Sequence, residues 1–432
     1  MRLNILKLNT NEQGFEKKLL NKIRIKNTIN IKAQNEVARI ISNVKNKGDK
    51  ALISYVSKFD NFKIKNIKEI IISKKDTAKA YKNVSKTQIS NLKKAIKRIT
   101  DFSKRQLSSS WSFSKDNTTL GEKITPINSI GVYVPGGKAS YPSTVLMNTI
   151  PAKVAGVKKI FMVSPINNIE DHALAIVAAE LCGVDKIFRI GGAHAIASLT
   201  YGTKNIPSVD KIVGPGNIYV SLAKKIVYGD VGIDNIAGPS EIVIIADKSN
   251  NPDWVALDLF SQAEHDELAQ PILISTSQKF LNDVEISIKK LLPLLLRKKI
   301  ITKSFNSRGM CIKAKNNNEI ANIVNKIAPE HLEIMIKNNK NLLKMINNAG
   351  AVFLGQYSPE VFGDYCAGPN HVLPTSGSAR FSSPLGVYDF QKRSSIINIS
   401  KKTAKELSKI SVSIALAEGL QAHALSAKLR ED

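Results

Sequence analysis

The residue types that bind metals and move protons are concentrated in "SQAEHDELAQ", residues 261–270. Gln262 and His265 stand three residues apart there, and Leu259 stands three residues before Gln262. A helix whose apolar stripe runs through Val255 and Leu259 would carry Gln262 and His265 on the continuation of that stripe, one turn apart. An amide and an imidazole then stand where leucines would be expected, which asks for a chemical explanation.

The six histidines of the chain mostly stand near acidic side chains. The pairings are His331 directly after Glu330, His371 seven residues after Asp364, and His423 five residues after Glu418. Neutral imidazoles with one carboxylate are the ligand set that Zn²⁺ prefers, and an adjacent Glu-His pair suits base catalysis beside a metal. The pattern favours a metal-assisted acid/base enzyme, although each histidine taken singly also fits a structural or capping role.

Two glycine-rich turns stand between an expected strand and an expected helix. They are "RIGGAHAIA" at 189–197 and "VGPGNIYV" at 213–220. Exposed N–H groups and the positive end of a helix dipole favour a phosphate at such turns. Neither turn matches G-x-G-x-x-G and no Walker A pattern occurs, so both also fit ordinary tight turns.

The elements that must position these residues alternate between strand and helix from about residue 130 onward. This alternation predicts an α/β fold with a mostly parallel, doubly wound sheet. The first 110 residues are Lys-rich with helical periodicity, and "LSSSWSFSKDN" at 107–117 reads as a loop. Further expectations are a helix from 143 to 157 capped by Ser143, a helix whose first turn holds Pro329 before Glu330 and His331, and one C-terminal helix from 403 to 430.

The charge of +27 arises from 63 Lys and Arg against 36 acidic residues. A nucleic-acid partner would explain such an excess. The excess is mostly Lys, however, scattered among Asn and Ile rather than gathered in one stripe, and no RNP-type motif, KH loop or Cys/His finger occurs. We therefore expect no specific nucleic acid as a partner, and background basicity is the preferred interpretation.

The apolar content and the cysteines bear on the compartment. No uncharged apolar span of 18 residues occurs, so no membrane association is expected, and the N-terminal residues have no signal-peptide core. Cys182, Cys311 and Cys366 stand far apart without a CxxC, which argues against a disulfide framework or a zinc ribbon. These features predict a cytoplasmic protein.

Seven segments occur in an order that resembles the histidinol dehydrogenase family. They are "GVYVPGGKASYPSTVLMNTIPAKVAGV", "VGPGNIYV", "IAGPSEIVIIAD", "SQAEHDELAQ", "APEHLEIM", "GPNHVLPT" and "EGLQAH". The resemblance runs from about residue 25 to the C-terminus. It implies an NAD-dependent enzyme that oxidises L-histidinol to L-histidine, in the last steps of histidine biosynthesis, through an aldehyde and with two NAD⁺ in succession.

The resemblance also implies a role for individual residues. One Zn²⁺ per subunit would be held by Gln262, His265, Asp364 and His423. Glu330 would activate water and His331 would take the hydroxyl proton. The substrate would contact the four zinc ligands and His331, and also Ser240, His371 and Glu418. The cofactor contacts would be Tyr133, His194 and Asn217.

A homodimer with shared active sites is the implied assembly. The family fold is two Rossmann-like doubly wound α/β domains, with smaller, mostly helical N- and C-terminal segments exchanged in the dimer. The expected division is an N-terminal arm at 1–24, a discontinuous α/β domain of 25–128 with 241–380 that carries the metal and catalytic residues, a Rossmann-like NAD domain at 129–240, and a C-terminal dimerisation segment at 381–432. The Ser/Gly-rich stretch at 375–386 could let the last segment cross over.

Two positions depart from the family pattern. His194 stands where the family usually has Gln, which puts that cofactor contact in doubt because imidazole is rigid and titrates near neutrality. Cys366 stands where a small residue is common, and it suggests a thiohemiacetal route like that of aldehyde dehydrogenases as the alternative mechanism. A basic nucleic-acid-binding protein and a folded relic without activity are the other open alternatives.

Overall fold

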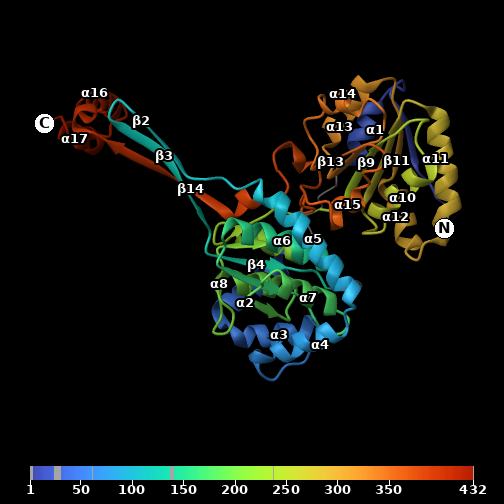
Figure 1. Cartoon of the computed structure of the whole chain (residues 1–432), viewed down its shortest axis with the longest axis horizontal. Coiled ribbons are helices and arrows are strands. Elements are labelled where there is room, and N and C mark those ends of the chain that lie inside the picture. The colour runs from blue at the N-terminus through green and yellow to red at the C-terminus, as the bar shows by residue number, and fades with distance from the viewer. Residues whose placement is uncertain (1–2, 24–30, 61, 137–140, 237, 432) are drawn as a thin grey trace.

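Two α/β lobes and one long arm make up the chain (Figure 1). The computed structural model describes residues 3–23, 31–60, 62–136, 141–236 and 238–431. Each lobe is built on a parallel sheet, and the arm is an antiparallel three-stranded ribbon that ends in two helices. The mostly parallel α/β architecture expected from the alternating pattern is confirmed.

The first lobe contains a five-stranded parallel sheet in the order β6-β5-β4-β7-β8. Its strands are β4 (Ser129–Tyr133), β5 (Lys159–Val163), β6 (Lys186–Phe188), β7 (Lys211–Val213) and β8 (Gly232–Ile233). Side chains alternate between two cores, since Ile130 and Val132 face one and Phe161 and Val163 face the other. Both faces are covered by helices, as a parallel sheet requires. The crossover helices are α6 (Pro142–Ala155), α7 (Ala173–Leu181), α8 (Gly192–Tyr201) and α9 (Ile218–Val227).

The N-terminal helices pack on this first sheet. They are α2 (Ile31–Lys47), α3 (Asp49–Phe59), α4 (Lys74–Lys82) and α5 (Lys86–Lys104), with a short turn η1 (Ile67–Ile70) between. Their apolar faces enter the cores of the first lobe through residues such as Val37, Val56 and Ile99. This packing differs from the expected grouping of 25–128 with 241–380, because amphipathic periodicity says which face of a helix is buried but not against which sheet.

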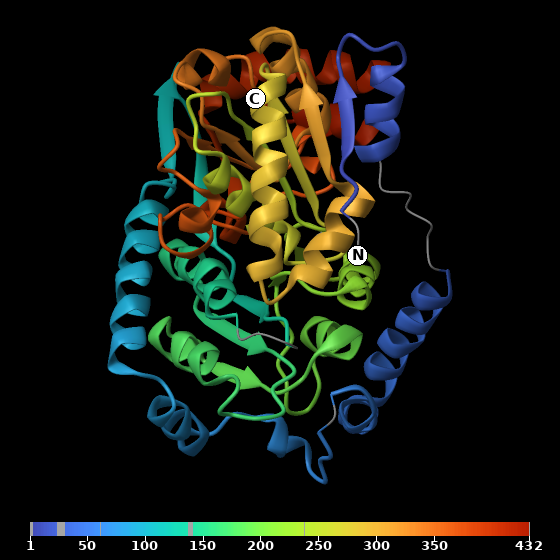
Figure 2. The same ribbon diagram turned by 90° about the vertical axis from the view of Figure 1, so that its right-hand side faces the viewer.

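The second lobe contains a six-stranded parallel sheet in the order β1-β11-β10-β9-β12-β13. The strands are β1 (Leu6–Asn9), β9 (Glu241–Ile245), β10 (Gln270–Ser275), β11 (Met310–Lys313), β12 (His331–Ile334) and β13 (Ala351–Leu354). Strand β1 comes from the segment expected to be only an arm, and it pairs with β11. Figure 2 shows the two lobes stacked one above the other, with α5 along one side of the first.

Helices cover both faces of the second sheet. Val243 and Ile245 of β9 face one core and Ile242 and Ile244 face the other. The helices are α1 (Phe15–Ile23), α10 (Pro252–Ala263), α11 (Gln278–Leu291), α12 (Lys298–Arg308), α13 (Asn317–Ile327), α14 (Asn339–Leu343) and α15 (Glu360–Tyr365), with a short turn η2 (Leu292–Leu294) after α11. Two more short turns, η3 (Ser378–Arg380) and η4 (Val387–Phe390), lead from this lobe toward the arm.

The arm consists of residues 111–126 and 391–429. Its sheet has the order β14-β3-β2, with β2 (Trp111–Lys115), β3 (Thr118–Pro126) and β14 (Gln391–Ile399), and it ends in α16 (Lys401–Ala417) and α17 (Gln421–Lys428). The expected loop at 107–117 is therefore half wrong, because residues 111–115 form a strand. Asp116 and Asn117, with φ of 49° and 58°, make the two-residue turn of a hairpin.

Three local expectations also fail. Residues 403–430 form two helices rather than one, since the chain turns at Gly419 with φ 74°. Ser143 does not cap α6, whose N-cap is Tyr141 with Pro142 in the first turn. Pro329 precedes strand β12 rather than a helix, because α13 already ends at Ala328 in the left-handed conformation and the chain enters the sheet at once.

Candidate active site

Glu330 and His331 lie at the amino end of β12, beside the amino end of β9. His331 pairs in register with Ile242. The backbone N–H of Glu241 donates to Glu330 Oε2 at 2.9 Å, and His331 Nδ1 lies 3.1 Å from the Glu241 carbonyl oxygen. Because a carbonyl only accepts, the Nδ1 of His331 carries a proton, and its Nε2 is the ring nitrogen that faces Asp364. The main chain at the start of β9 thus fixes both side chains.

Asp364 and His371 complete one side of this cluster. His331 Nε2 lies 3.5 Å from Asp364 Oδ1. Asp364 stands in the last turn of α15, and His371 Nδ1 lies 2.9 Å from the Asp364 carbonyl oxygen. Asp364 and His371, seven residues apart, are therefore brought together as the sequence suggested.

The loop after α15 connects this side of the cluster to the first lobe through hydrogen bonds. Arg98 Nε donates to the Cys366 carbonyl at 2.7 Å, and Asn370 Nδ2 donates to the Met147 carbonyl at 2.6 Å. Arg98 belongs to α5 and Met147 to α6. The cluster therefore lies where the two lobes meet.

Gln262 and His265 come from the end of α10. Gln262 is in the last turn and only 1% exposed, and its Oε1 is buried with no hydrogen-bond partner among the described residues. The helix ends at Ala263, earlier than expected, and His265 lies in the following turn, where its N–H donates to the Gln262 carbonyl at 3.1 Å.

Burial and neighbouring charges shift the pKa values of the titratable groups in the cluster. Burial raises the pKa of Glu330 to about 8, although His331 opposes the shift. Burial alone would lower the pKa of His331, but the carboxylates of Glu330, Asp364 and Glu360 raise it to about 10. Burial lowers the pKa of His265, which favours the neutral imidazole that a metal requires. His331 holds the pKa of Asp364 below its usual range in spite of burial.

Of the four expected zinc ligands, His265 and Asp364 lie close enough to influence each other's pKa, and Gln262, buried in the last turn of α10, precedes His265 by three residues. The orphaned Oε1 of Gln262 fits a ligand position, since a buried amide oxygen without a partner is costly. Among the described residues, no group of three or more His, Cys, Asp or Glu can hold a metal by itself.

The fourth expected ligand is remote within the chain. His423 lies on α17, at the far end of the arm, and it is exposed; Glu418 lies beside it at the end of α16 (Figure 1). Neither residue reaches the cluster of its own chain. Ser240, by contrast, directly precedes β9 and so lies at the same sheet edge as Glu241.

Cys366 is a free, exposed thiol at the end of α15. No described side chain forms a hydrogen bond or an ion pair with its sulfur; its carbonyl accepts from Arg98 and its N–H donates to the Phe362 carbonyl. No described residue is placed to act as its base, so this geometry does not favour the thiohemiacetal alternative.

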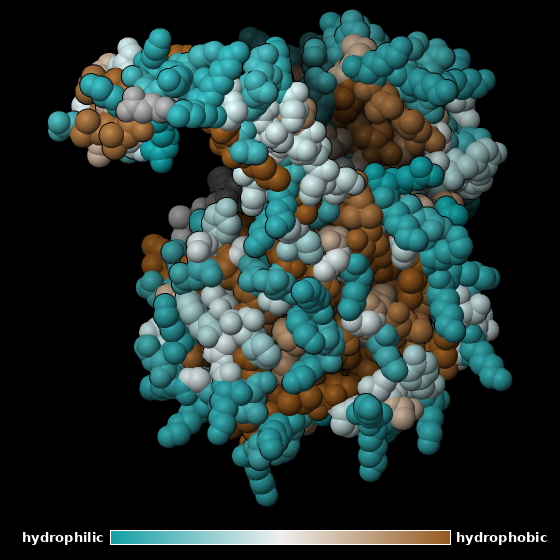
Figure 3. Space-filling model, turned by 60° about the vertical axis from the view of Figure 1, so that its left-hand side comes forward, coloured by the Kyte–Doolittle hydropathy of each residue, from teal (hydrophilic) through white to brown (hydrophobic). Residues whose placement is uncertain are grey.

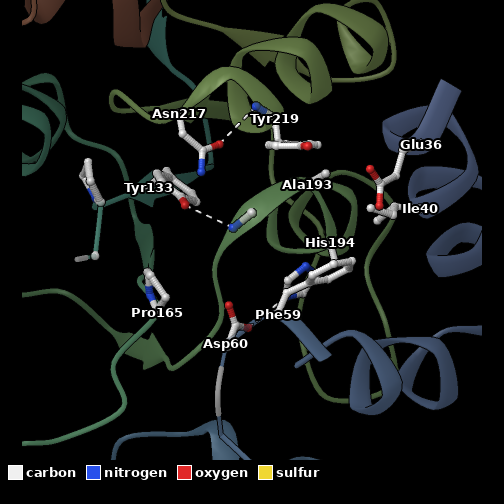
Figure 4. A pocket seen from close by; sticks show the side chains of 13 residues that line it. Glu36, Ile40, Phe59, Asp60, Tyr133, Pro165, Ala193, His194, Asn217 and Tyr219 are labelled. Atoms are coloured by element: carbon white, nitrogen blue, oxygen red, sulfur yellow. Dashed lines mark hydrogen bonds and ion pairs between the residues drawn. The ribbon is translucent and has the colours of Figure 1, made fainter. Parts of the chain in front are cut away.

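A second group of expected residues lines a pocket of about 390 Å³ in the first lobe (Figure 4). Tyr133, His194 and Asn217 all face it. Tyr133 Oη accepts a hydrogen bond of 3.1 Å from the N–H of Gly192, at the start of α8. Asn217 caps α9, because its Oδ1 accepts from the N–H groups of Tyr219 and Val220. The amino ends of two helices therefore open on the pocket.

The turn before Asn217 depends on glycine. Gly214 has φ 109°, and a Cβ there would lie 2.1 Å from the Tyr133 carbonyl oxygen. The buried ammonium of Lys224 is paired with Asp234, and it also donates to the Gly214 carbonyl at 3.0 Å. This ion pair holds the turn against β4.

His194 is engaged by a residue that the sequence did not reveal. Its Nε2 lies 2.8 Å from Asp60 Oδ2, and both side chains are buried. Tyr55 and Phe59 stack near its ring at centroid distances of 6.0 and 6.1 Å. The imidazole is thus fixed from α3 and the residue that follows it, which explains how histidine is accommodated where the family has glutamine.

A buried group of carboxyls stands behind Gln262 and is also new. Glu333 Oε1 accepts from the N–H of Glu360 at 2.7 Å, and Ser261 Oγ donates to Glu360 Oε1 at 2.8 Å. Gln262 and Asp258 lie close to this pair, Gln262 near Glu360 and Asp258 near Glu333. No spacing in the sequence signals this group, because its members come from α10, β12 and α15.

In the part of the chain that the structure describes, no helix is long and apolar enough to cross a bilayer.

Comparisons with known proteins agree with the family that the motifs suggested. The family model described as "Histidinol dehydrogenase" matches residues 24–431. A histidinol dehydrogenase of Hydrogenovibrio crunogenus is 48% identical over 430 residues, 99% of each chain, and one of Dechloromonas aromatica is 52% identical over 395 residues, 91% of each chain. A crystal structure of histidinol dehydrogenase from Elizabethkingia anophelis superposes with a TM-score of 0.93 at 34% identity, covering 100% of this chain and 98% of that one.

Proposed function

The chain belongs to the histidinol dehydrogenase family, and it is therefore an oxidoreductase of histidine biosynthesis. We propose that it oxidises L-histidinol to L-histidine at the lobe interface, with NAD⁺ in the first-lobe pocket and one Zn²⁺ per subunit. The observation that carries this assignment is the buried Glu330–His331 pair with Asp364 Oδ1 3.5 Å from His331 Nε2, and the unpartnered, buried Oε1 of Gln262 supports it.

Gln262, His265 and Asp364 would hold the zinc ion from one chain. Bound zinc would anchor the imidazole and amino nitrogens of histidinol and so orient the substrate. Asp364 would supply the negative charge, and His265 stays neutral because burial lowers its pKa. Ser240 and His371 remain the predicted substrate contacts at the same sheet edge, with Glu418 as a third.

His331 is the proposed acid/base for the alcohol step. Its Nδ1 is committed to the Glu241 carbonyl, so Nε2 is the ring nitrogen left to take the hydroxyl proton, which it does in the neutral form of the imidazole. Glu330 and Asp364 stabilise the imidazolium that results, and both raise the pKa of His331. Bound NAD⁺ would supply the hydride acceptor for the two oxidation steps.

Glu330 is the proposed base for the aldehyde step. The pKa of its carboxyl is raised to about 8 by burial, so its carboxylate is a stronger base than an exposed glutamate and suits the activation of water. Its Oε2 accepts the Glu241 N–H, which leaves Oε1 to contact the water. The hydrate formed at the aldehyde carbon then loses its hydride, and the carboxylic acid is produced.

The NAD⁺ proposal is supported by the pocket that Tyr133, His194 and Asn217 line. The N–H groups at the amino ends of α8 and α9 favour a pyrophosphate there without the G-x-G-x-x-G fingerprint. The Nδ2 of Asn217 stays available because its Oδ1 serves as the helix cap. His194 presents a ring fixed by Asp60 rather than the flexible amide usual in the family.

A second copy of the chain is the proposed source of the missing zinc ligand. The arm carries exposed apolar side chains that its own chain leaves uncovered, among them Trp111, Phe113, Ile397, Ile410, Ile414 and Leu429. Figure 3 shows such residues at the end of the projecting arm. Exposed apolar surface of this kind marks a protein interface. We propose a homodimer in which His423 and Glu418 enter the site of the other subunit.

Counting products tests the proposed function directly. Purified, zinc-loaded protein should form two NADH for each histidinol consumed, with no free aldehyde accumulating, because one site performs both steps. One NADH for each histidinol, with the aldehyde released to solution, would contradict it.

We place the reaction in the cytoplasm, where the three free thiols of Cys182, Cys311 and Cys366 are compatible with reducing conditions.

A further inference from the structure

The pocket of the first lobe is lined by two parts of the chain with different chemistry. Tyr133 ends β4 and Asn217 follows β7, so both belong to the carboxyl edge of the sheet. Glu36 and Ile40 reach the pocket from α2, on its other side (Figure 4). Helix α2 packs on α8 and α9 without being part of the strand-helix alternation. The part of the pocket lined by Glu36, Ile40 and Phe59 is called the α2 end below.

The position of the catalytic cluster determines which half of the cofactor lies at the α2 end. The loop that follows Asp364 is hydrogen-bonded to Arg98 of α5 and to Met147 of α6. Helices α5 and α6 pack into one core of the first lobe, and α2, α8 and α9 pack into the core on the opposite face of the sheet. Figure 2 shows α2 and α5 on opposite sides of this lobe. The nicotinamide half must approach Glu330 and His331 on the side of α5 and α6, so the adenosine half lies toward the α2 end.

The α2 end has the chemistry of an adenosine site. Ile40 and Phe59 provide apolar surface for a base, and Glu36 provides a carboxylate, which can only accept hydrogen bonds. The adenosine ribose of NAD⁺ carries two hydroxyl donors, and acidic side chains accept from the 2′-hydroxyl in other dinucleotide-binding sites. Within the described residues the half-buried Glu36 side chain has no hydrogen bond or ion pair, so its carboxylate is free to accept.

The charge at this end is negative, although the whole chain carries +27. Glu36 and Asp60 are the carboxylates that line the pocket, and no described lining residue is a Lys or an Arg. Lys32 and Arg39 stand on the same helix as Glu36 but do not line the pocket. A 2′-phosphate, as in NADP⁺, needs a cation beside it and would instead meet a carboxylate of like charge.

We infer that Glu36 is a specificity-determining residue, whose carboxylate accepts from the adenosine ribose of NAD⁺ and excludes a nucleotide with a 2′-phosphate. This inference rests on the proposed NAD⁺ pocket and adds to it a residue from outside the sheet and its crossover helices. Helix α2 thereby has a role in the choice of cofactor.

The first experiment measures the binding of NAD⁺ and of NADP⁺ to zinc-loaded wild type and Glu36→Gln by titration calorimetry. The wild type should bind NAD⁺ more tightly than NADP⁺. Glu36→Gln should weaken NAD⁺ binding by about 3- to 10-fold, because a neutral acceptor makes a weaker hydrogen bond than a carboxylate. The same change should strengthen NADP⁺ binding by about tenfold, because the like-charge repulsion is removed. A purely structural role predicts that both affinities fall together.

Glu180→Gln is the matched control. Glu180 is exposed on α7, which packs on the opposite face of the first sheet from α2, and it does not line the pocket. The substitution removes the same charge from the same lobe. Both affinities should stay within about twofold of the wild type, since a solvent-exposed charge across the sheet is largely screened.

The second experiment changes the ligand as well as the protein. An NAD⁺ analogue whose adenosine ribose lacks the 2′-hydroxyl should bind the wild type about tenfold less tightly than NAD⁺, since a hydrogen bond to a charged group is lost. In Glu36→Ala the acceptor is already absent, so the analogue and NAD⁺ should bind nearly equally, and this non-additivity identifies the contact. An equal loss in both proteins would show that Glu36 does not bind the hydroxyl.

The outcomes separate this inference from the proposed function. If the wild type binds NAD⁺ and Glu36→Gln leaves the ratio of the two affinities unchanged, the selective role is refuted and the NAD⁺ pocket stands. If the wild type binds neither nucleotide, the proposed pocket itself is wrong. Thermal unfolding verifies that the variants fold. If they do not, the wild type decides alone: weaker binding of both NADP⁺ and the analogue supports the inference, and binding equal to that of NAD⁺ refutes it.

Discussion

At the scale of single residues, the site separates two bases that stand next to each other in the chain. Glu330 and His331 share Glu241 as a main-chain partner, through its N–H for the first and its carbonyl for the second. Their side chains therefore stay distinct, with 3.8 Å between Glu330 Oε2 and His331 Nδ1. This arrangement supports two different tasks for the two residues.

Replacing Glu330 by Gln should separate the half-reactions. The amide keeps the size of the side chain but cannot take a proton from water, so aldehyde oxidation should slow by about 10²- to 10⁴-fold while alcohol oxidation slows much less. His331→Ala should impair both steps. Single-turnover measurements started from histidinol and from histidinaldehyde check this, and equal losses for both substrates in Glu330→Gln would disprove the division of roles.

Replacing His265 by Ala should remove zinc without unfolding the chain. His265 lies in the turn after α10 and belongs to none of the hydrophobic cores, so the variant should keep its secondary structure. Metal analysis after dialysis should find little zinc, and turnover should fall to near background. Cys366→Ala serves as the control, since the exposed thiol has no proposed role and should retain zinc and activity. Full zinc occupancy in His265→Ala would remove this residue from the ligand set.

The identity of the site residues could be predicted from the sequence better than their surroundings. Motif order was sufficient to select Gln262, His265, Asp364 and the Glu330–His331 pair, and the structure places Asp364 Oδ1 3.5 Å from His331 Nε2. Asp60, Glu333 and Glu360 were not found, because each meets its partner across a long chain separation that no local pattern encodes. Asp60 and His194, for example, are 134 residues apart.

At the scale of elements, the buried strands could be predicted from the sequence and the exposed strand β14 could not. Continuous apolar runs such as Ile242–Ile245 predicted the buried parallel strands correctly. The arm strand β14 was missed, since its sequence "QKRSSIINI" is exposed along nearly its whole length and has no core to impose a pattern. The strand β12 was expected to be a helix, because a proline before a strand and a proline in a first helical turn look alike in sequence.

The contact between α10, β12 and α15 should make the stability of the metal-free protein depend on pH. Burial raises the pKa of Glu360 to about 7 and that of Glu333 well above its usual value. A carboxyl whose pKa is raised by folding stabilises the fold below its unfolded pKa of about 4.3. That stabilisation is lost as pH rises through the folded pKa, near 7 for Glu360.

Urea unfolding of metal-free protein at pH 5 and pH 8 measures this effect. The free energy of unfolding should be lower at pH 8, and Glu333→Gln should reduce the difference by about 1.4 kcal/mol for each unit of pKa shift that it removes. Glu69→Gln, a change at an exposed cap carboxylate in the first lobe, should leave the pH dependence as it is. A Glu333→Gln variant with the wild-type pH dependence would show that Glu333 is not its source.

At the scale of the whole molecule, the arm separates His423 from the cluster that it is proposed to complete. Co-expression of His265→Ala with His423→Ala tests whether the sites are shared. In a mixed dimer with sites completed in trans, one site collects both lesions and the other is intact. With random pairing, about half the dimers are mixed and each has one good site of two, so roughly a quarter of wild-type activity should return.

An arrangement in which each chain completes its own site predicts a different recovered activity. If His423 completed the site of its own chain through a rearranged arm, every site would carry one lesion and no activity would return. Mixed dimers must be shown to form, for example by two different affinity tags. Absence of complementation in isolated mixed dimers would therefore overturn the shared-site proposal.

The position of β1 at the edge of the second sheet has a consequence for how the chain is made. Leu6 pairs with Met310, so the first strand to leave the ribosome must wait until β11 has been made. At about 5–20 residues per second, that wait is on the order of 15–60 s. The first-lobe sheet closes over residues 129–233 alone and needs no such delay. We expect nascent chains stalled after residue 260 to protect the first lobe from protease while β1 stays cleavable, and simultaneous protection of both would contradict this order.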